Sequence, residues 1–137
     1  KLCLVSLAIA VAVAVLVCSG GRPGRGLNEN LARELLELHT LGVDGGYTET
    51  DVKEVARCFT GWTFDFDTGL FEYRSDWHDH FQKTVLGTYI APNQPALFDG
   101  NVVLDEVATH PGTARNISTK LARRLIGDNF DPAVVDA

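Results

Sequence analysis

What the sequence lacks narrows the function classes open to this chain. It has no methionine and only three cysteines, Cys3, Cys18 and Cys58. Their number is odd and no two stand in Cys-x-x-Cys spacing, which indicates neither a disulfide framework nor a zinc knuckle. The nucleophile elbow, the P-loop, Gly-x-Gly-x-x-Gly and His-Glu-x-x-His are also absent, so the motifs of hydrolases, nucleotide-binding proteins and zincins are excluded. No small-molecule substrate can be identified from the sequence.

Basic residues are scarce after the first 26 positions. The net charge is −6, but three of the 12 basic residues precede residue 27, whereas all 18 acidic residues follow it. Residues 27–137 therefore carry a net charge of −9. Because neutralising nucleic-acid phosphates requires a basic face, we exclude nucleic acid as a partner. A protein or envelope partner stays open.

The only long apolar run, residues 2–17, is shorter than the roughly 20 residues that span a bilayer. One lysine before it and small residues after it favour a secretory signal peptide. A core strand and an artefactual sequence junction are the alternatives. We therefore divide the chain into an apolar segment (1–20), a Gly/Arg linker (21–26) and a folded domain (27–137). A signal peptide predicts a secreted, periplasmic or envelope-associated protein.

Residues 28–42 carry the strongest helical pattern in the chain. Asn28 is a good N-cap, Gly42 is a good residue to follow the last turn, and Glu29 is spaced to pair with Arg33. The leucines recur at helical spacing and predict one buried stripe, Leu31, Leu35, Leu38 and Leu41.

Two polar residues interrupt the packed side of this helix. Glu34 falls between leucines of the stripe, and His39 falls beside them. A buried carboxylate needs a partner. We therefore expect Glu34 to bind Arg57, Arg115 or another polar group from a later helix.

A second helix and a hairpin follow. Thr48 and Asp51 form a capping box that opens a helix ended by Gly61, with Cys58 on its flank as ordinary packing. The period then changes from helical to two, on either side of a turn at residues 67–69, which predicts a β-hairpin. Its aromatic face should lie on the helix pair, although exposed aromatics could instead stack on carbohydrate: Trp62, Phe64, Phe66, Phe71 and Tyr73.

The remainder of the chain predicts polar loops and a second helix pair. Residues 75–87 and 91–100 are loop-like in composition. Asn101 can cap a third helix that ends at His110, and Pro111 starts a fourth that ends at Gly127. The expected inward face of the fourth helix is Ala114, Ile117, Ser118, Leu121 and Leu125. The fold class predicted is therefore mainly α, with one inserted hairpin.

The histidines and nearby carboxylates are the candidates for chemistry. His78 and His80 form a His-x-His pair, whose rings project to one side of an extended segment and suit a transition metal. Their simplest interpretation is local hydrogen bonding, and the simplest interpretation of His110 is a C-terminal helix cap, with a shared site with His39 or His78 as the alternative. As catalytic candidates we take Glu34, His39, His78, Asp79 and His110, and as candidate metal ligands His39, His78, Asp79 and His110. A divalent metal is the cofactor that such a site would use.

The sequence also resembles a known family. Residues 26–43, read as Gly-Leu-Asn-Glu-Asn-Leu-Ala-Arg-Glu-Leu-Leu-Glu-Leu-His-Thr-Leu-Gly-Val, resemble the signature of the bacterial family DUF1800. Further matching segments are Tyr47-Thr48 with Asp51-Val52, Thr60-Gly61-Trp62, His78-Asp79, residues 83–87, residues 110–115 and residues 120–124. The family pattern does not require His80.

The resemblance implies a secreted or envelope protein that is mostly helical and has no established activity. Members of the family are longer, so the chain is expected to be a fragment of a larger helical domain. Two functions follow as hypotheses. The first is an extracytoplasmic scaffold or interaction domain, and the alternative is an enzyme, metal-assisted, that gathers the candidate residues into one site.

Overall fold

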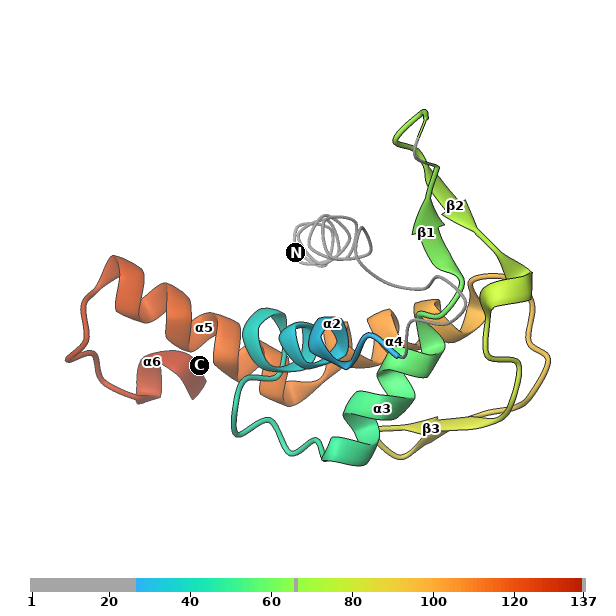
Figure 1. Ribbon diagram of the computed structural model, residues 1–137. Coiled ribbons are helices and arrows are strands. Elements are labelled where there is room, and N and C mark those ends of the chain that lie inside the picture. Colours follow the sequence, from blue (N-terminus) through green and yellow to red (C-terminus); the bar gives the residue numbers. More distant parts are fainter. Residues whose placement is uncertain (1–26, 66, 137) are drawn as a thin grey trace.

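The computed structural model describes residues 27–65 and 67–136 (Figure 1). The predictions made for the apolar segment and the linker lie outside these residues. The elements, in chain order, are α2 (Glu29–Glu34), the π-helix η1 (Leu35–His39), α3 (Glu49–Cys58), β1 (Trp62–Phe64), β2 (Phe71–Tyr73), the 3-10 turn η2 (Ser75–Trp77), β3 (Lys83–Val85), β4 (Thr88–Ile90), α4 (Phe98–Thr109), α5 (Pro111–Leu125) and α6 (Ala133–Asp136).

The prediction of a mainly α fold with one hairpin is wrong. Two antiparallel two-stranded sheets are present, β1–β2 with Trp62 opposite Tyr73, and β3–β4 with Lys83 opposite Ile90. The second hairpin falls where the sequence predicted a polar loop. Leu86 and Gly87 form its turn with φ of 51° and 87°, and two positive φ values in a two-residue connection are typical of a type I′ turn.

The first helix begins as predicted but changes its winding. The Asn28 side chain accepts a hydrogen bond from Leu31 N at 3.1 Å, which confirms the cap. From Leu35 the helix is π, and the wider turn shifts the phase of the side chains that follow. Leu36 is therefore fully buried, while Leu38, expected in the buried stripe, is 52% exposed. The predicted pair of Glu29 and Arg33 is also replaced, because Arg33 binds Glu49 with two contacts of 2.7 Å.

Helix α3 agrees closely with the helix predicted from the sequence. Both hydrogen bonds of the Thr48–Asp51 capping box are present, and the apolar side chains at helical spacing, Val52, Val55 and Ala56, are buried. The same helix holds the β3–β4 hairpin. Asp51 Oδ1 accepts from Leu86 N at 2.8 Å and Glu54 Oε2 accepts from Thr84 N at 3.0 Å. Two helix carboxylates thus satisfy backbone N–H groups of the β3–β4 hairpin that no strand pairs.

Within the part of the chain that the structure describes, the β1–β2 hairpin packs at its base and projects away from the helices (Figure 1). Trp62 is buried against Phe59, edge to face at 5.1 Å between ring centroids, and its ring also lies against Gly100 of α4. Farther out, Phe71 is 52% exposed. The expectation that the whole aromatic face lies on the helix pair is therefore wrong, because the hairpin tip extends beyond the helices.

Helices α4 and α5 differ from their predicted bounds and faces. Helix α4 begins at Phe98, so Asn101 lies inside the helix and is not its cap. Helix α5 begins at Pro111 as predicted. Its expected apolar face is mostly solvent-exposed, with Leu125 80% exposed, and polar contacts attach the helix to η1 and to the residue that follows η1. Asn116 Nδ2 donates to Thr40 O at 2.6 Å, and Lys120 Nζ donates to Leu38 O at 2.7 Å.

Candidate functional site

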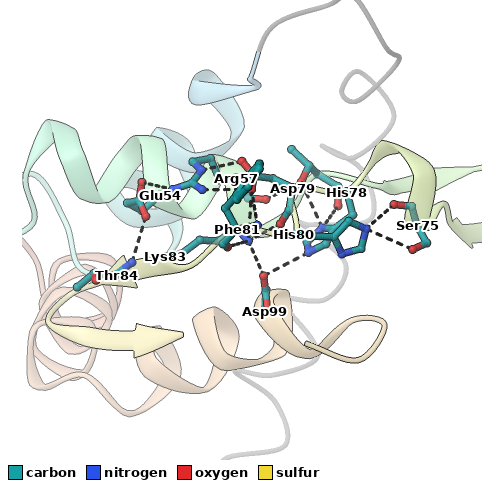
Figure 2. A network of polar contacts seen from close by, with 11 residues as sticks. Glu54, Arg57, Ser75, His78, Asp79, His80, Phe81, Lys83, Thr84 and Asp99 are labelled. Carbon is teal, nitrogen blue, oxygen red and sulfur yellow. Dashed lines mark hydrogen bonds and ion pairs between the residues drawn. The ribbon is translucent and has the colours of Figure 1, made fainter. Parts of the chain in front are cut away.

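Six charged or ionisable side chains meet where α3, β3 and α4 approach the segment that follows η2 (Figure 2). We call this group the ion cluster: Glu54, Arg57, His78, Asp79, Lys83 and Asp99. Helix α3 supplies the first two, residues 78 and 79 follow η2, and the last two come from β3 and α4. The cluster therefore joins four parts of the fold.

Lys83 lies at the centre of the ion cluster. Its side chain is 0% exposed, which is rare for an ammonium group. Nζ donates to Asp99 Oδ2 at 2.7 Å, to Phe81 O at 2.9 Å and to Asp79 O. An ammonium has three donors, so every donor of this group has an acceptor. Full hydrogen bonding and a paired carboxylate are the conditions under which a buried charge is tolerated.

Arg57 holds the outer side of the cluster. Nε and Nη2 donate to the two oxygens of Asp79 at 2.8 and 3.1 Å, and Nη1 donates to Glu54 Oε1 at 2.7 Å. Two parallel bonds to one carboxylate are the strongest arrangement that a guanidinium makes. The hydrogen bonds that Arg57 donates to Asp79 raise the pKa of Arg57, so this cation is permanent.

His78 spans the space between α3 and α4. Its Nδ1 lies 2.7 Å from Thr60 O, and its Nε2 lies 3.2 Å from Asp99 Oδ2. The side chain is 7% exposed and stands edge to face against His80, with ring centroids 5.1 Å apart. The rings of the His-x-His pair therefore meet as expected. Both ring nitrogens of His78 are nevertheless occupied, so neither is free for a metal or a substrate.

Cys58 lies beside the cluster without the properties of a nucleophile. The residue is fully buried, and burial raises the pKa of its thiol to about 12. Because the thiolate is the reactive form of cysteine, this side chain is inert at neutral pH. Its role is packing, as the sequence predicted.

The other candidate residues lie outside the ion cluster. The Glu34 carboxylate accepts from Asn30 Nδ2 at 3.1 Å on its own helix, and not from a later helix as expected. His110 Nδ1 accepts from Gly112 N at 3.0 Å and caps α5. No hydrogen bond between described residues joins His39 or His110 to His78. Within residues 27–65 and 67–136, no group of three His, Cys, Asp or Glu side chains is placed to hold a metal ion.

Glu34 gives a first prediction. Because its partner is exposed and local, we expect Glu34→Gln to change the free energy of unfolding by less than about 0.5 kcal/mol. Urea denaturation of the two proteins measures this difference. A loss above about 2 kcal/mol would show that the carboxylate has a buried partner in solution.

The comparisons with known proteins place the chain in a family but give it no activity. Residues 15–137 match the family described as "Protein of unknown function (DUF1800)". The chain belongs to the DUF1800 family. No curated protein and no solved structure matches it. The family resemblance seen in the sequence is thereby confirmed, whereas the chemistry of this DUF1800 chain has to be argued from its own residues.

Four members of the ion cluster are not among the candidate site residues of this DUF1800 chain: Glu54, Arg57, Lys83 and Asp99. The sequence presents Arg57 only as one possible partner of Glu34, beside Arg115 and other polar groups, and it places Lys83 in a segment of loop-like composition. A signal for Lys83 does exist, because Lys83 and Val85 alternate with Thr84 as on one face of a strand. No pattern in the sequence indicates that Asp99 is buried, since its burial depends on how α4 packs against the rest of the fold.

Finally, none of the helices that the structure describes is long and apolar enough to cross a membrane.

The pKa of Asp79 gives a second prediction. Partial burial raises this pKa, but the hydrogen bonds from Arg57 and Phe81 N and the charges of Arg57 and Lys83 outweigh burial, so the net shift is downward from 3.8. A depressed carboxyl pKa adds stability that is present above the unfolded-state value, about 3.9, and is lost as pH falls through the folded-state value. We therefore expect stability to fall below about pH 4.

Asp79→Asn tests this assignment. The variant should be less stable than the natural sequence at neutral pH, and its stability should fall less steeply on acidification. Urea denaturation at several pH values between neutral and strongly acidic measures both slopes. Asp105→Asn is the matched control, because Asp105 is an exposed aspartate on α4. Equal slopes for the natural protein and Asp79→Asn would contradict the prediction.

Proposed function

We propose that this chain is a non-catalytic structural part of an extracytoplasmic bacterial protein, acting as a scaffold or interaction domain. One observation carries the proposal. The groups best suited to acid–base or nucleophilic chemistry are buried. His78 and Lys83 have their nitrogen atoms hydrogen-bonded within the fold, and Cys58 is fully enclosed in the core. A catalytic acid or base must instead reach the proton that it transfers.

The exposed apolar side chains support a role in contacts with protein. Leu70 and Phe71 on the projecting β1–β2 hairpin are 68% and 52% exposed. Leu121, Leu125 and Ile126 are also exposed, along the last turns of α5 and the residue after it. Exposed apolar groups that gather on an element are typical of surfaces that contact other protein. The extracytoplasmic location rests on the signal-peptide pattern of residues 1–20 and on the family resemblance.

The enzymatic alternative has less support. It requires the candidate histidines and carboxylates to share a site, whereas His110 caps α5, Glu34 binds Asn30, and both ring nitrogens of His78 are engaged. No observation on the described residues favours a metal-assisted reaction over the structural role.

The experiment that tests the proposal separates folding from chemistry. A bacterium that carries the gene would receive variants of the full-length protein with Lys83→Met, Asp99→Leu and both changes together. If the cluster is structural, the phenotype should follow the fraction of folded protein, and a double variant that folds should restore function. A folded double variant without function would overturn the proposal.

Location needs its own measurement. The mature protein would be recovered from periplasmic, envelope, medium and cytoplasmic fractions, and the mass of its N-terminal peptide determined. An extracytoplasmic scaffold should lack residues 1–20 and be found outside the cytoplasm. Intact protein confined to the cytoplasm would contradict the location.

A further inference from the structure

The hydrogen-bond partners of His78 decide where its protons are. Nδ1 faces Thr60 O at 2.7 Å and Thr60 Oγ1 at 3.2 Å. The carbonyl is an acceptor, and the hydroxyl donates its one proton to Arg57 O at 2.6 Å, so it too can only accept from the ring. Nδ1 must therefore carry a proton.

The other ring nitrogen meets a second acceptor. Nε2 lies 3.2 Å from Asp99 Oδ2, and the same oxygen accepts from Lys83 Nζ at 2.7 Å. A hydrogen bond across this gap needs one proton, on Nε2 or on the carboxyl. The ammonium of Lys83 favours the ionised carboxylate at this oxygen, because an adjacent positive charge stabilises it. The proton therefore belongs on Nε2.

The charge of the ion cluster leads to the same assignment. Three carboxylates, Glu54, Asp79 and Asp99, face two cations, the guanidinium of Arg57 and the ammonium of Lys83. With a neutral His78, this largely buried group would keep one uncompensated negative charge, which is costly in a medium of low dielectric constant. A doubly protonated His78 makes the positive and negative charges equal.

We propose that His78 carries a proton on both ring nitrogens, is the third cation of the ion cluster, and acts as a proton-dependent latch that fastens the segment between β2 and β3 to α3 and α4. With the proton, the ring bonds Thr60 at the end of α3 and Asp99 on α4. Without it, the Nε2 lone pair faces a carboxylate, so the bond to α4 is lost and the segment is released on that side.

Groups from every neighbouring element take part in this balance. The ionisable side chains around the ring are Asp99 from α4, Lys83 from β3, Arg57, Glu54 and Cys58 from α3, Tyr73 from β2, and Asp79 and His80 from its own segment. Tyr73 contacts the ring with its aromatic face, 5.7 Å between centroids, and burial raises the pKa of its hydroxyl. Tyr73 therefore stays neutral while His78 changes charge.

Nuclear magnetic resonance of the full chain with ¹⁵N-labelled histidine tests the proposal. At neutral pH, both ring nitrogens of His78 should give N–H signals, assigned by their absence from His78→Gln. In Asp99→Asn the proton on Nε2 should be lost, while Nδ1–H stays on Thr60 O. A single protonated ring nitrogen in the natural protein would overturn the assignment.

A second measurement needs no variant. Histidine in an unfolded chain is mostly neutral at about pH 7.5, so unfolding the natural protein there should release close to one proton per chain. Release can be followed with an indicator dye in weakly buffered denaturant. Release of no proton would overturn the proposal, whether or not Asp99→Asn and His78→Gln fold.

Discussion

Replacing Lys83 by methionine should lower the free energy of unfolding by about 3–5 kcal/mol, the usual loss when one partner of a buried ion pair is removed. Methionine keeps much of the side-chain volume but donates no hydrogen bond. Among the described residues Asp99 would keep His78 alone as a hydrogen-bond partner, and the carbonyls of Asp79 and Phe81 would lose the ammonium. Urea denaturation followed by circular dichroism measures the change.

Two variants make this result specific to the buried pair. Lys53→Met is the same change at an exposed lysine of α3, and it should cost less than about 0.5 kcal/mol. Lys83→Met with Asp99→Leu removes both charges, so the double variant should be more stable than the sum of the single losses predicts. A loss below about 1 kcal/mol for Lys83→Met would mean that its ammonium reaches water in solution.

Gly61→Ala should be the next most damaging single change, at about 2–4 kcal/mol. Gly61 has a φ of +80°, which strains any residue with a Cβ. An added Cβ would also lie 2.5 Å from Arg74 O and 3.1 Å from His78 Cβ. The carbonyl is backbone and cannot swing away, so the start of the segment that carries His78 would have to move.

Gly46→Ala separates the two causes. Gly46 has nearly the same φ, +83°, but a Cβ there would meet nothing within 4 Å. This variant should show only the conformational cost, about 1–2 kcal/mol. Thermal and urea denaturation of both variants measure the difference. Equal losses would contradict the predicted contact with Arg74.

Local signals in the sequence predicted those features that local chemistry determines. Asn28 caps its helix because a side-chain oxygen reaches an N–H three residues on, and Thr48 with Asp51 works in the same way. Pro111 begins α5 because it lacks an N–H that the first turn would leave unbonded. The β3–β4 hairpin also carried a local signal, since Leu86-Gly87 stands between short alternating runs, but the polar residues before it obscured the pattern.

The features that were missed depend on contacts between distant residues. The π-helix cannot be predicted from the leucine spacing, because an α-helix satisfies that spacing equally well. His78 and Asp79 could be named from their residue types and proximity in sequence. Their partners could not, since Lys83 and Asp99 are buried only after β3 and α4 pack on α3, and the strand-like alternation around Lys83 does not identify the residues that it binds.

The ion cluster also has a consequence for the order of folding. Its hydrogen bonds and ion pairs join residues no more than 30 positions apart, whereas the bonds that attach α5 to Thr40, just after η1, and to Leu38 in η1 span 76 and 82 positions. Closing a short loop loses less chain entropy, and contacts between nearby residues speed folding. We therefore expect pulse-labelled hydrogen exchange to show α3 and β3 protected before α5 attaches to η1, and simultaneous protection would contradict this order. The stretch from α3 to α4 would then be the nucleus on which the C-terminal helix assembles.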